Sequence, residues 1–400
     1  MQRTHNRVIV AGGGPVGAVA ALLLARAHVP VTMIERASDV VLDYRASTFH
    51  PPTLDLLEDS GITAALVAMG LVCPTVQIRD REIGKVAEFD VTRLKNETRH
   101  PYRLQCEQFK LVGHVYQELA KFPGVDLRFG HEVVAIDQNE DGIAVTAEHA
   151  GERVAIRGDV VIGCDGGRST VRKLMDIPFP GLTYPEHFLV AGTRFDFRAR
   201  MPDIASVNYT ADPVRWFMLL QIPDMWRILV PVAPEVSADD AVSDESLQSS
   251  LQNVCPRPDD YEIVVRAIYR VHQRVADTYR RGRVFLAGDA AHLNNPLGGM
   301  GLNGGLHDVI SLTDRLIAWW HGRTDAAHLD GYEPQRRPEA INAIHAITAR
   351  NKKLLEERDP EVRARNLDEM RRTAADPARS YQYLLDSAMI SSLRRSGMIR

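Results

Sequence analysis

The sequence predicts an α/β protein: a mostly antiparallel sheet is inserted into a helix-covered parallel sheet, and the C-terminus is helical. Three observations predict this class. Near the N-terminus, a glycine-rich turn joins an apolar run to a helical stretch rich in Ala and Leu. From about residue 183 to 272, alternating segments recur between Pro and Asp turns, as in antiparallel strands. From about Asn303 onward the pattern is helical.

The composition is that of an ordinary globular protein. The chain has 400 residues, 45% apolar and 25% charged, which suits two interlocked domains. Its net charge of −4 indicates neither a nucleic-acid partner nor a membrane surface. The 4 cysteines form no CxxC pair, and no His/Cys cluster has metal-ligand spacing. We therefore expect no metal and, without a signal-peptide pattern, a cytoplasmic location.

The N-terminal unit has the order strand, turn, helix, strand. Residues 7–11 (RVIVA) form the first apolar run, and the helical stretch after the glycines extends to about Ala27. A second apolar run at residues 29–34 ends in Glu35. This order is typical of the βαβ start of a Rossmann-like domain.

The turn between the first strand and the helix has the spacing GxGxxG, and each glycine has its own reason. Gly12 permits the tight turn, Gly14 lets the backbone approach a pyrophosphate, and Gly17 lets the helix pack closely on the sheet. Glu35 follows about 20 residues later, where a carboxylate binds a ribose diol. The pattern predicts a dinucleotide site without choosing the dinucleotide.

Two later motifs identify that dinucleotide by resemblance. Asp165-Gly166 stands in CDGGRSTVR, and GDAAH at 288–292 is followed by PLGGMGLNGG at 296–305. With the glycine turn, these motifs resemble the FAD-dependent aromatic hydroxylases, the para-hydroxybenzoate hydroxylase-like flavoprotein monooxygenases, over about residues 7–340. The strings YRVHQR and NPLGGMGLNGG are most similar to the branch of para-nitrophenol monooxygenase and 3-(3-hydroxyphenyl)propionate hydroxylase.

The resemblance implies a Rossmann-like FAD-binding domain of the para-hydroxybenzoate hydroxylase type that is discontinuous in the chain. The expected segments are 1–75, 100–182 and 273–340 for this domain, 76–99 and 183–272 for a substrate-binding β-sheet domain, and 341–400 for C-terminal helices. These last helices either cover the core or support a homodimer contact.

The resemblance also places FAD against residues of all three motifs and a few others. The implied cofactor-binding residues are Gly12, Gly14, Pro15, Val16, Gly17, Glu35, Arg36, Arg45, Gln108, Val133, Asp165, Asp289, Gly301, Leu302 and Asn303. Independently of the resemblance, Asp289 follows a strand and can accept hydrogen bonds from flavin hydroxyls. Backbone N–H groups at the helix start near Asn303 suit the flavin pyrimidine edge.

Three of these assignments keep an ordinary alternative. Arg45 also fits a surface ion pair, Gln108 a helix cap, and Val133 simple core packing. Met300 departs from the family pattern, since many relatives carry Gln in the corresponding GGQG.

The reaction that the resemblance implies is aromatic hydroxylation. NADPH or NADH reduces the flavin, O2 adds to form a C4a-hydroperoxide, and its terminal oxygen attacks an electron-rich phenol or hydroxypyridine. The phenol has to be deprotonated or polarised, so we expect a hydrogen-bond partner for its hydroxyl. The expected partners of the protein are thus FAD, a nicotinamide nucleotide, a small aromatic substrate and O2.

The substrate residues are less clearly marked. Tyr209 resembles the family tyrosine that binds the phenolic oxygen, and Pro296 begins the glycine-rich turn beneath the flavin; both are expected at the catalytic centre. Gln221, Trp216 and Tyr102 are expected to line the substrate pocket, although Trp216 fits ordinary sheet core equally well. No arginine follows Gln221 to hold a carboxylate as in the hydroxybenzoate enzyme, which argues against a benzoate bound in that manner.

Two other classes compete with a hydroxylase. A related FAD-dependent halogenase or reductase would share the cofactor motifs, but the tryptophans do not form the WxWxIP pattern of halogenases. A non-enzymatic flavin-binding regulator is also conceivable, since one fold hosts many functions. The complete set of FAD motifs and the inserted sheet argue against it.

Overall fold

The structure is a computed structural model that describes residues 7–44 and 46–400. Its first layer is a six-stranded sheet, parallel except at one edge strand. In spatial order the strands are β18 (Arg280–Arg281), β19 (Val284–Leu286), β12 (Val160–Gly163), β1 (Val8–Ala11), β2 (Val31–Glu35) and β8 (Val125–Phe129). Strands β1, β12 and β19 are entirely buried, as expected for short apolar runs in a parallel sheet covered on both faces.

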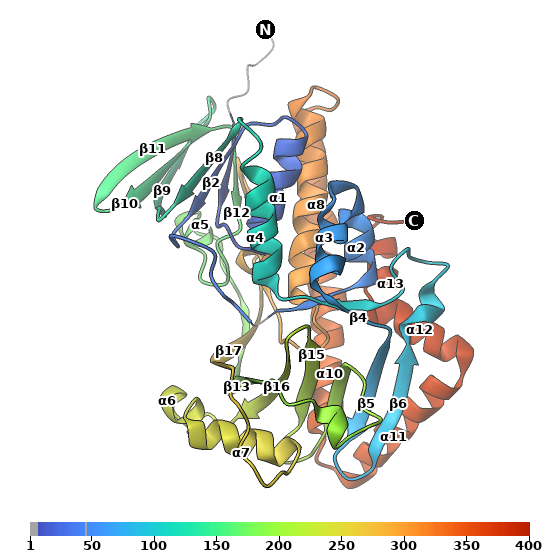
Figure 1. The fold of residues 1–400 in the computed structure, drawn as a ribbon. Coiled ribbons are helices and arrows are strands. Elements are labelled where there is room, and N and C mark those ends of the chain that lie inside the picture. The colour runs from blue at the N-terminus through green and yellow to red at the C-terminus, as the bar shows by residue number, and fades with distance from the viewer. Residues whose placement is uncertain (1–6, 45) are drawn as a thin grey trace.

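Helices cover one face of this sheet and a small antiparallel sheet covers the other (Figure 1). The helices are α1 (Pro15–Arg26), α4 (Gln108–Leu119) and α8 (Gly301–Trp320), with α2 (Pro51–Leu57) and α3 (Ile62–Met69) beside them. The small sheet consists of β9 (Glu132–Gln138), β10 (Ile143–His149) and β11 (Glu152–Gly158), and α5 (Thr170–Leu174) packs near β9. The predicted helices after the glycine turn and from residue 108 are confirmed.

The second large layer is an eight-stranded sheet that is antiparallel except for one pair. Its spatial order is β20 (His292–Leu293), β17 (Val265–Val275), β13 (Gly181–Thr193), β16 (Met225–Val232), β15 (Phe217–Ile222), β14 (Val207–Ala211), β5 (Thr75–Asp80) and β6 (Gly84–Asp90). The parallel pair is β14 with β5, which joins two segments far apart in sequence.

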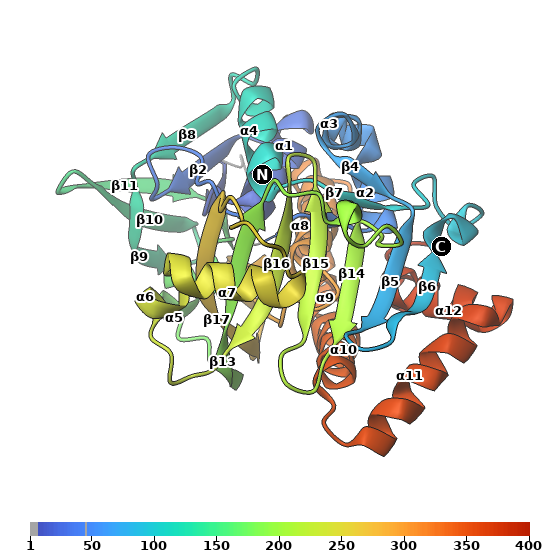
Figure 2. The ribbon, with the colours of Figure 1, turned by 60° about the horizontal axis from the view of Figure 1, so that its bottom comes forward.

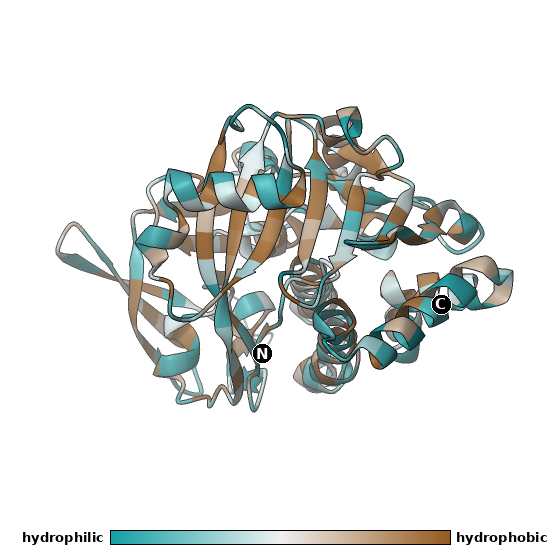
Figure 3. Ribbon diagram, turned by 90° about the horizontal axis from the view of Figure 1, so that it is seen from below, coloured by the Kyte–Doolittle hydropathy of each residue, from teal (hydrophilic) through white to brown (hydrophobic). Residues whose placement is uncertain are grey.

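Each face of this sheet packs against different partners because side chains alternate along a strand. Helix α7 (Asp244–Val254), preceded by α6 (Ala238–Ala241), lies across the outer face (Figure 2). The strands are rich in apolar residues, whereas α7 presents mainly hydrophilic ones to solvent (Figure 3). The inner face turns toward the first layer. A three-stranded sheet of β3 (Thr48–Phe49), β7 (Arg103–Gln105) and β4 (Leu71–Cys73) lies beside it.

The C-terminal helices cover the edge of the second layer. They are α10 (Ala346–Glu356), α11 (Pro360–Ala375), α12 (Pro377–Ser387) and α13 (Ile390–Arg395), whereas the preceding α9 (Tyr332–Glu339) packs against α8 in the first layer. Helix α11 runs beside β6, and Leu367, Leu384 and Ile390 are buried in one apolar cluster with Phe89 of that strand (Figure 2). The C-terminal segment thus completes the core of the second layer. Within the described residues, no helix has the length and apolar character needed to cross a bilayer.

Candidate active site

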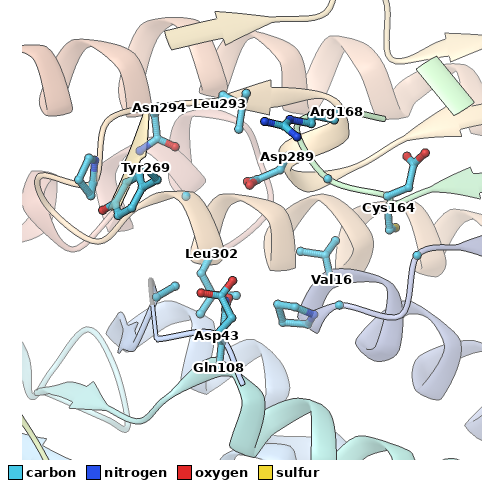
Figure 4. A pocket seen from close by; sticks show the side chains of 18 of the residues that line it. Val16, Asp43, Gln108, Cys164, Arg168, Tyr269, Asp289, Leu293, Asn294 and Leu302 are labelled. Atoms are coloured by element: carbon cyan, nitrogen blue, oxygen red, sulfur yellow. The ribbon is translucent and has the colours of Figure 1, made fainter. Parts of the chain in front are cut away.

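A cavity of about 450 Å³ is lined by residues of both layers. Figure 4 shows Val16, Asp289 and Leu302 at its wall, from three separate parts of the chain. From the predicted cofactor set the cavity is lined by Gly12, Gly14, Pro15, Val16, Glu35, Arg36, Gln108, Val133, Asp165, Asp289, Gly301 and Leu302. The fold therefore brings all three motifs to one cavity, although they are separated by more than a hundred residues in sequence.

The glycine turn has the geometry that the sequence predicts. Gly12 has a φ of +103°, and a Cβ there would lie 2.5 Å from the backbone oxygen of Cys164. At Gly17 a Cβ would lie 1.9 Å from the oxygen of Gly12, so α1 packs on the turn itself. A Cβ on Gly14 would meet nothing within 4 Å, and Gly14 lines the cavity. Only Gly14 of the three therefore leaves room that a ligand can take.

Glu35 is fixed by the turn that it follows. Its carboxylate accepts hydrogen bonds from the N–H of Gly13 at 2.6 Å and of Ala37 at 2.8 Å. The hydroxyl of Tyr116, on α4, donates to the carbonyl of Gly13 at 2.6 Å. These contacts hold the carboxylate at the cavity wall, where its remaining lone pairs can accept further hydrogen bonds.

Asp165 organises the second motif. Its carboxylate accepts hydrogen bonds from the hydroxyl of Ser169 at 2.5 Å and from the N–H of Val171 at 3.0 Å. Burial raises the pKa of Asp165, and these hydrogen bonds oppose the rise. Arg172 then joins this loop to the third motif, because its guanidinium donates to the carbonyls of Gly167 and Ala290, each at 2.9 Å. The structure thus gives Asp165 a part in holding its own loop at the cavity.

The loop that carries Asp289 is held from behind by a buried charge network. Asp308, on α8, accepts hydrogen bonds from the N–H of Gly288 at 3.1 Å, Nε2 of His292 at 2.7 Å and Nε of Arg336 at 2.8 Å. Burial would raise the pKa of Asp308, but His292 and Arg336 hold it below its ordinary value. His292 therefore belongs to the scaffold of this loop.

The turn before α8 is fixed by Asn303, which does not line the cavity. Its amide donates to the carbonyls of Thr48 at 2.8 Å and Gly299 at 2.7 Å, and its oxygen accepts from the N–H of His50 at 2.9 Å. Asn303 is buried, and its amide group makes these hydrogen bonds within the protein. A ligand at this turn would therefore contact the backbone of the turn and not the side chain of Asn303. Gly17 is likewise absent from the cavity wall.

His50 braces the same turn from the side. Its Nε2 donates to the carbonyl of Gly298 at 2.8 Å. Burial, aided by the Arg103 guanidinium, lowers the pKa of His50 to about 3, so the ring is neutral.

The structure adds cavity residues that were not predicted. Arg227 lies in the middle of β16 and donates to the carbonyl of Tyr44 and the hydroxyl of Ser47. Ser47 in turn donates to Oε1 of Gln105 at 2.8 Å. The sequence signal that could have pointed to Arg227 is a charged residue inside the apolar string MWRILVPV. Other unpredicted lining residues are Asp43, Thr48, His131, Arg168, Tyr269, Arg270 and His272.

The predicted substrate residues are dispersed. Pro296 lines the large cavity. Tyr209 instead lines a second cavity of about 20 Å³, which shares Met300 with the first. Trp216 is buried against Phe188, with ring centroids 5.3 Å apart, on the same face as the cavity-lining side chains but away from the cavity wall.

Two expected pocket residues point elsewhere. Gln221 belongs to the outer face of its sheet, where its Oε1 accepts from Arg198 at 2.7 Å and Ser206 at 3.0 Å. The neighbouring Leu220 lines the cavity instead, since successive side chains of a strand face opposite sides. The hydroxyl of Tyr102 forms a hydrogen bond with Nδ1 of His100 at 2.9 Å, and Tyr102 lines neither cavity. Arg45 falls outside the described residues.

The donor set and the free space fit FAD. The open space beside Gly14 adjoins the N-terminus of α1, whose first N–H groups have no intrahelical acceptor and favour a pyrophosphate. At the other end, α8 starts at the cavity without a side-chain cap, which leaves N–H donors for a flavin ring. Pro15 at the start of α1 and Gly301 at the start of α8 both line this cavity, so one dinucleotide can contact both helix ends.

Comparison with known proteins gives the same family. Residues 5–346 match the family model described as FAD binding domain. The chain is 31% identical to para-nitrophenol 4-monooxygenase of Pseudomonas sp. (strain WBC-3) over 98% of this chain and 97% of that protein. It is 32% identical to 6-hydroxy-3-succinoylpyridine 3-monooxygenase HspB of Pseudomonas putida (strain DSM 28022 / S16), over 89% and 90% of the two chains.

A solved structure agrees over nearly the whole chain. The crystal structure of p-nitrophenol 4-monooxygenase PnpA from Pseudomonas putida DLL-E4 superposes with a TM-score of 0.92 at 32% identity, covering 98% of this chain and 99% of that one. The match therefore includes both layers and the C-terminal helices. This chain belongs to the FAD-dependent aromatic monooxygenases with an FAD binding domain.

Proposed function

We propose that this enzyme hydroxylates a phenol or a hydroxypyridine with NADPH or NADH and O2, using bound FAD. The observation that carries the proposal is the cavity of about 450 Å³, which is lined both by the FAD motifs and by residues of the eight-stranded sheet. Two relatives of similar length act on a nitrophenol and a hydroxylated pyridine, according to their names. Both are small aromatic rings with an electron-donating oxygen.

FAD would lie along the motifs in the order that the cavity presents them. Gly14 and the start of α1 would bind the pyrophosphate, Glu35 a ribose, and Asp289 the ribityl chain. Val133 would contact the adenine, and Gly301 and Leu302 the flavin ring. Pro15, Val16, Arg36, Gln108 and Asp165 complete the wall.

The chain supplies position, dryness and electrostatics for the reaction. Reduced FAD, when bound, supplies the electrons that allow one oxygen atom of O2 to enter the aromatic ring. Met218, Leu220 and Leu229 give the substrate end of the cavity an apolar wall that excludes water. The N-terminus of α8 places its N–H groups and positive dipole end where negative charge builds on a reduced flavin.

The test is oxidation of NADPH and NADH by the FAD-loaded enzyme, with and without phenols and hydroxypyridines, followed by mass analysis of the products. The proposal expects substrate-stimulated oxidation with one hydroxylated product per nicotinamide consumed. A halogenase or reductase would give no oxygen-labelled product from ¹⁸O2. Absence of substrate-stimulated oxidation with both nucleotides across the panel would overturn the proposal.

A further inference from the structure

Two histidine rings stack on each other at the wall of the large cavity. The rings of His131 and His149 are nearly parallel, with centroids 4.4 Å apart and an interplanar angle of 7°. His131 comes two residues after β8, and His149 is the last residue of β10. Of the two, only His131 lines the cavity, so the pair presents the ring of His131 to a ligand.

The ring of His131 is held in one orientation. Its Nδ1 donates a hydrogen bond to the carbonyl of Phe129 at 2.7 Å. His149 is fixed in the same manner, since its Nδ1 donates to the carbonyl of Gly130 at 2.8 Å. Gly130 has a φ of +69°, and a Cβ there would lie 3.1 Å from the His149 ring, so the glycine leaves room for that ring. Both rings are therefore held by the protein itself, which lowers the entropic cost of stacking a ligand on them.

The backbone ties this ring to the carboxylate that we assign to a ribose. The N–H of His131 donates to the carbonyl of Glu35 at 3.0 Å. Glu132 and Val133, the next two residues after His131, also line the cavity. A base carried by a ribose at Glu35 would therefore adjoin the ring of His131.

The ring of His131 offers such a base a flat aromatic surface. One of its faces is covered by His149, and within residues 7–44 and 46–400 no second aromatic ring stacks on the other. Stacking on an aromatic side chain stabilises any base, because every base has a π-face. A purine has a larger face than a pyrimidine, so adenine gains more from the contact. A base on His131 would continue the stack that His149 begins.

We propose that the adenine of FAD stacks on the open face of His131, and that His149 positions this ring from the other side. The inference rests on the FAD placement proposed above and adds the side chain that recognises the base. His131 touches the cofactor, whereas His149 acts through His131 as a positioning residue.

The test measures the Kd of the apoprotein for FAD by flavin fluorescence. His131→Ala should weaken FAD binding by about fivefold to a hundredfold, which is the range for loss of one base–aromatic stack. His131→Phe keeps a flat ring, so its Kd should stay within about threefold of the wild-type value. His328→Ala changes an exposed histidine outside the cavity and should leave the Kd unchanged.

An FAD analogue with a hydrogen atom in place of the adenine separates loss of the stack from damage to the site. The analogue keeps the pyrophosphate, the ribose and the flavin, so its Kd should differ by less than about twofold between the wild type and His131→Ala. Three results would overturn the inference: equal weakening of both ligands in His131→Ala, unchanged FAD binding in that variant, or binding in His131→Phe as weak as in His131→Ala.

A double-mutant cycle tests the positioning role of His149. His149→Ala should weaken FAD binding by about threefold in the wild type but by less than about 1.5-fold in His131→Ala, since its effect passes through the His131 ring. The same loss in both backgrounds would refute this role.

Comparison with Gly14→Val keeps this inference apart from the proposed function. Loss of FAD in Gly14→Val with normal binding in His131→Ala would refute only the adenine stack, whereas normal binding in both variants would refute the FAD placement itself. Binding is read without turnover, so the absence of a hydroxylated product would count against the proposed reaction and not against the stack.

Discussion

Oδ1 of Asp308 accepts a hydrogen bond from Nε of Arg336 at 2.8 Å, and the exposed fractions of the two side chains are 0% and 1%. Asp308 also bonds His292 and the N–H of Gly288, so one carboxylate holds the loop that carries Asp289. Breaking a buried pair of this kind leaves an uncompensated charge.

Asp308→Asn should therefore lower the free energy of unfolding by about 3–5 kcal/mol. Urea denaturation of the FAD-loaded enzyme measures this change. Asp330→Asn is the matched control, because the Asp330 side chain is 70% exposed in its ion pair with Arg280. This substitution should change the free energy of unfolding by less than about 1 kcal/mol. Similar losses in the two variants would contradict the structural role of the Asp308 network.

The pH dependence of stability should carry a contribution from His50. Its folded-state pKa of about 3 lies below the ordinary 6.5, so the folded protein binds this proton less readily than the unfolded chain. The stability that His50 contributes is complete above about pH 6.5 and falls by about 1.4 kcal/mol per pH unit as the pH drops toward 3. His50→Gln keeps a donor for the carbonyl of Gly298 but has no titrating ring. As the pH falls from about 6.5 to 5, its free energy of unfolding should decrease by about 2 kcal/mol less than that of the wild type. If the free energy of unfolding depends on pH in the same way in both proteins, His50 does not make this contribution.

Gly14→Val should abolish or weaken FAD binding by at least about tenfold without unfolding the chain. The backbone of Gly14, with φ −63° and ψ −178°, suits any residue, and a side chain there meets only the open cavity. Bound FAD is measured by absorbance after gel filtration and by fluorescence titration of the apoprotein. Gly124→Val, at an exposed position with nothing within 4 Å of a Cβ, should retain FAD. Normal FAD content in Gly14→Val would place the pyrophosphate elsewhere.

The register of β15 predicts opposite outcomes for two adjacent residues. Leu220→Ala removes part of the apolar wall of the cavity and should raise KM for the phenol by about fivefold to a hundredfold, since this loses about 1–3 kcal/mol of apolar contact. Gln221→Ala loses hydrogen bonds to Arg198 and Ser206 on the other face and should change KM by less than about twofold. Steady-state kinetics on the same substrate decides. A larger effect on KM from Gln221→Ala would show that Gln221 lines the substrate pocket.

Most of the cofactor half of the cavity could be predicted from the sequence, because its motifs obey local constraints. Gly12 and Gly17 have no room for a Cβ, and this requirement appears directly as glycine in the sequence. The apolar runs of β1, β12 and β19 likewise predict buried parallel strands. Asn303 shows the limit of the method: its place in the motif was correctly noted, but its side chain binds the protein's own backbone.

The substrate half could not be predicted in the same way, because it depends on pairing between distant strands. A one-residue shift in the assumed register of β15 exchanges Leu220 with Gln221 at the cavity wall. Arg227 and Arg103 are each buried by segments far away in sequence. Arg227 stands inside the apolar string MWRILVPV, whereas the string RLQ that begins with Arg103 carries no such signal.

The sequence by itself determined the family, the dinucleotide turn and the succession of strands and helices. These features follow from short-range sterics and side-chain periodicity, which depend only on residues close together in the sequence. The tertiary structure alone decided which residues face the cavity and which buried polar groups pair with one another. It brought Arg103 beside Tyr209 and Asp308 beside Arg336, and it separated the two cavities by Met300. Burial and partnership are properties of the packed chain, because the free energy of a buried charge depends on every group that surrounds it.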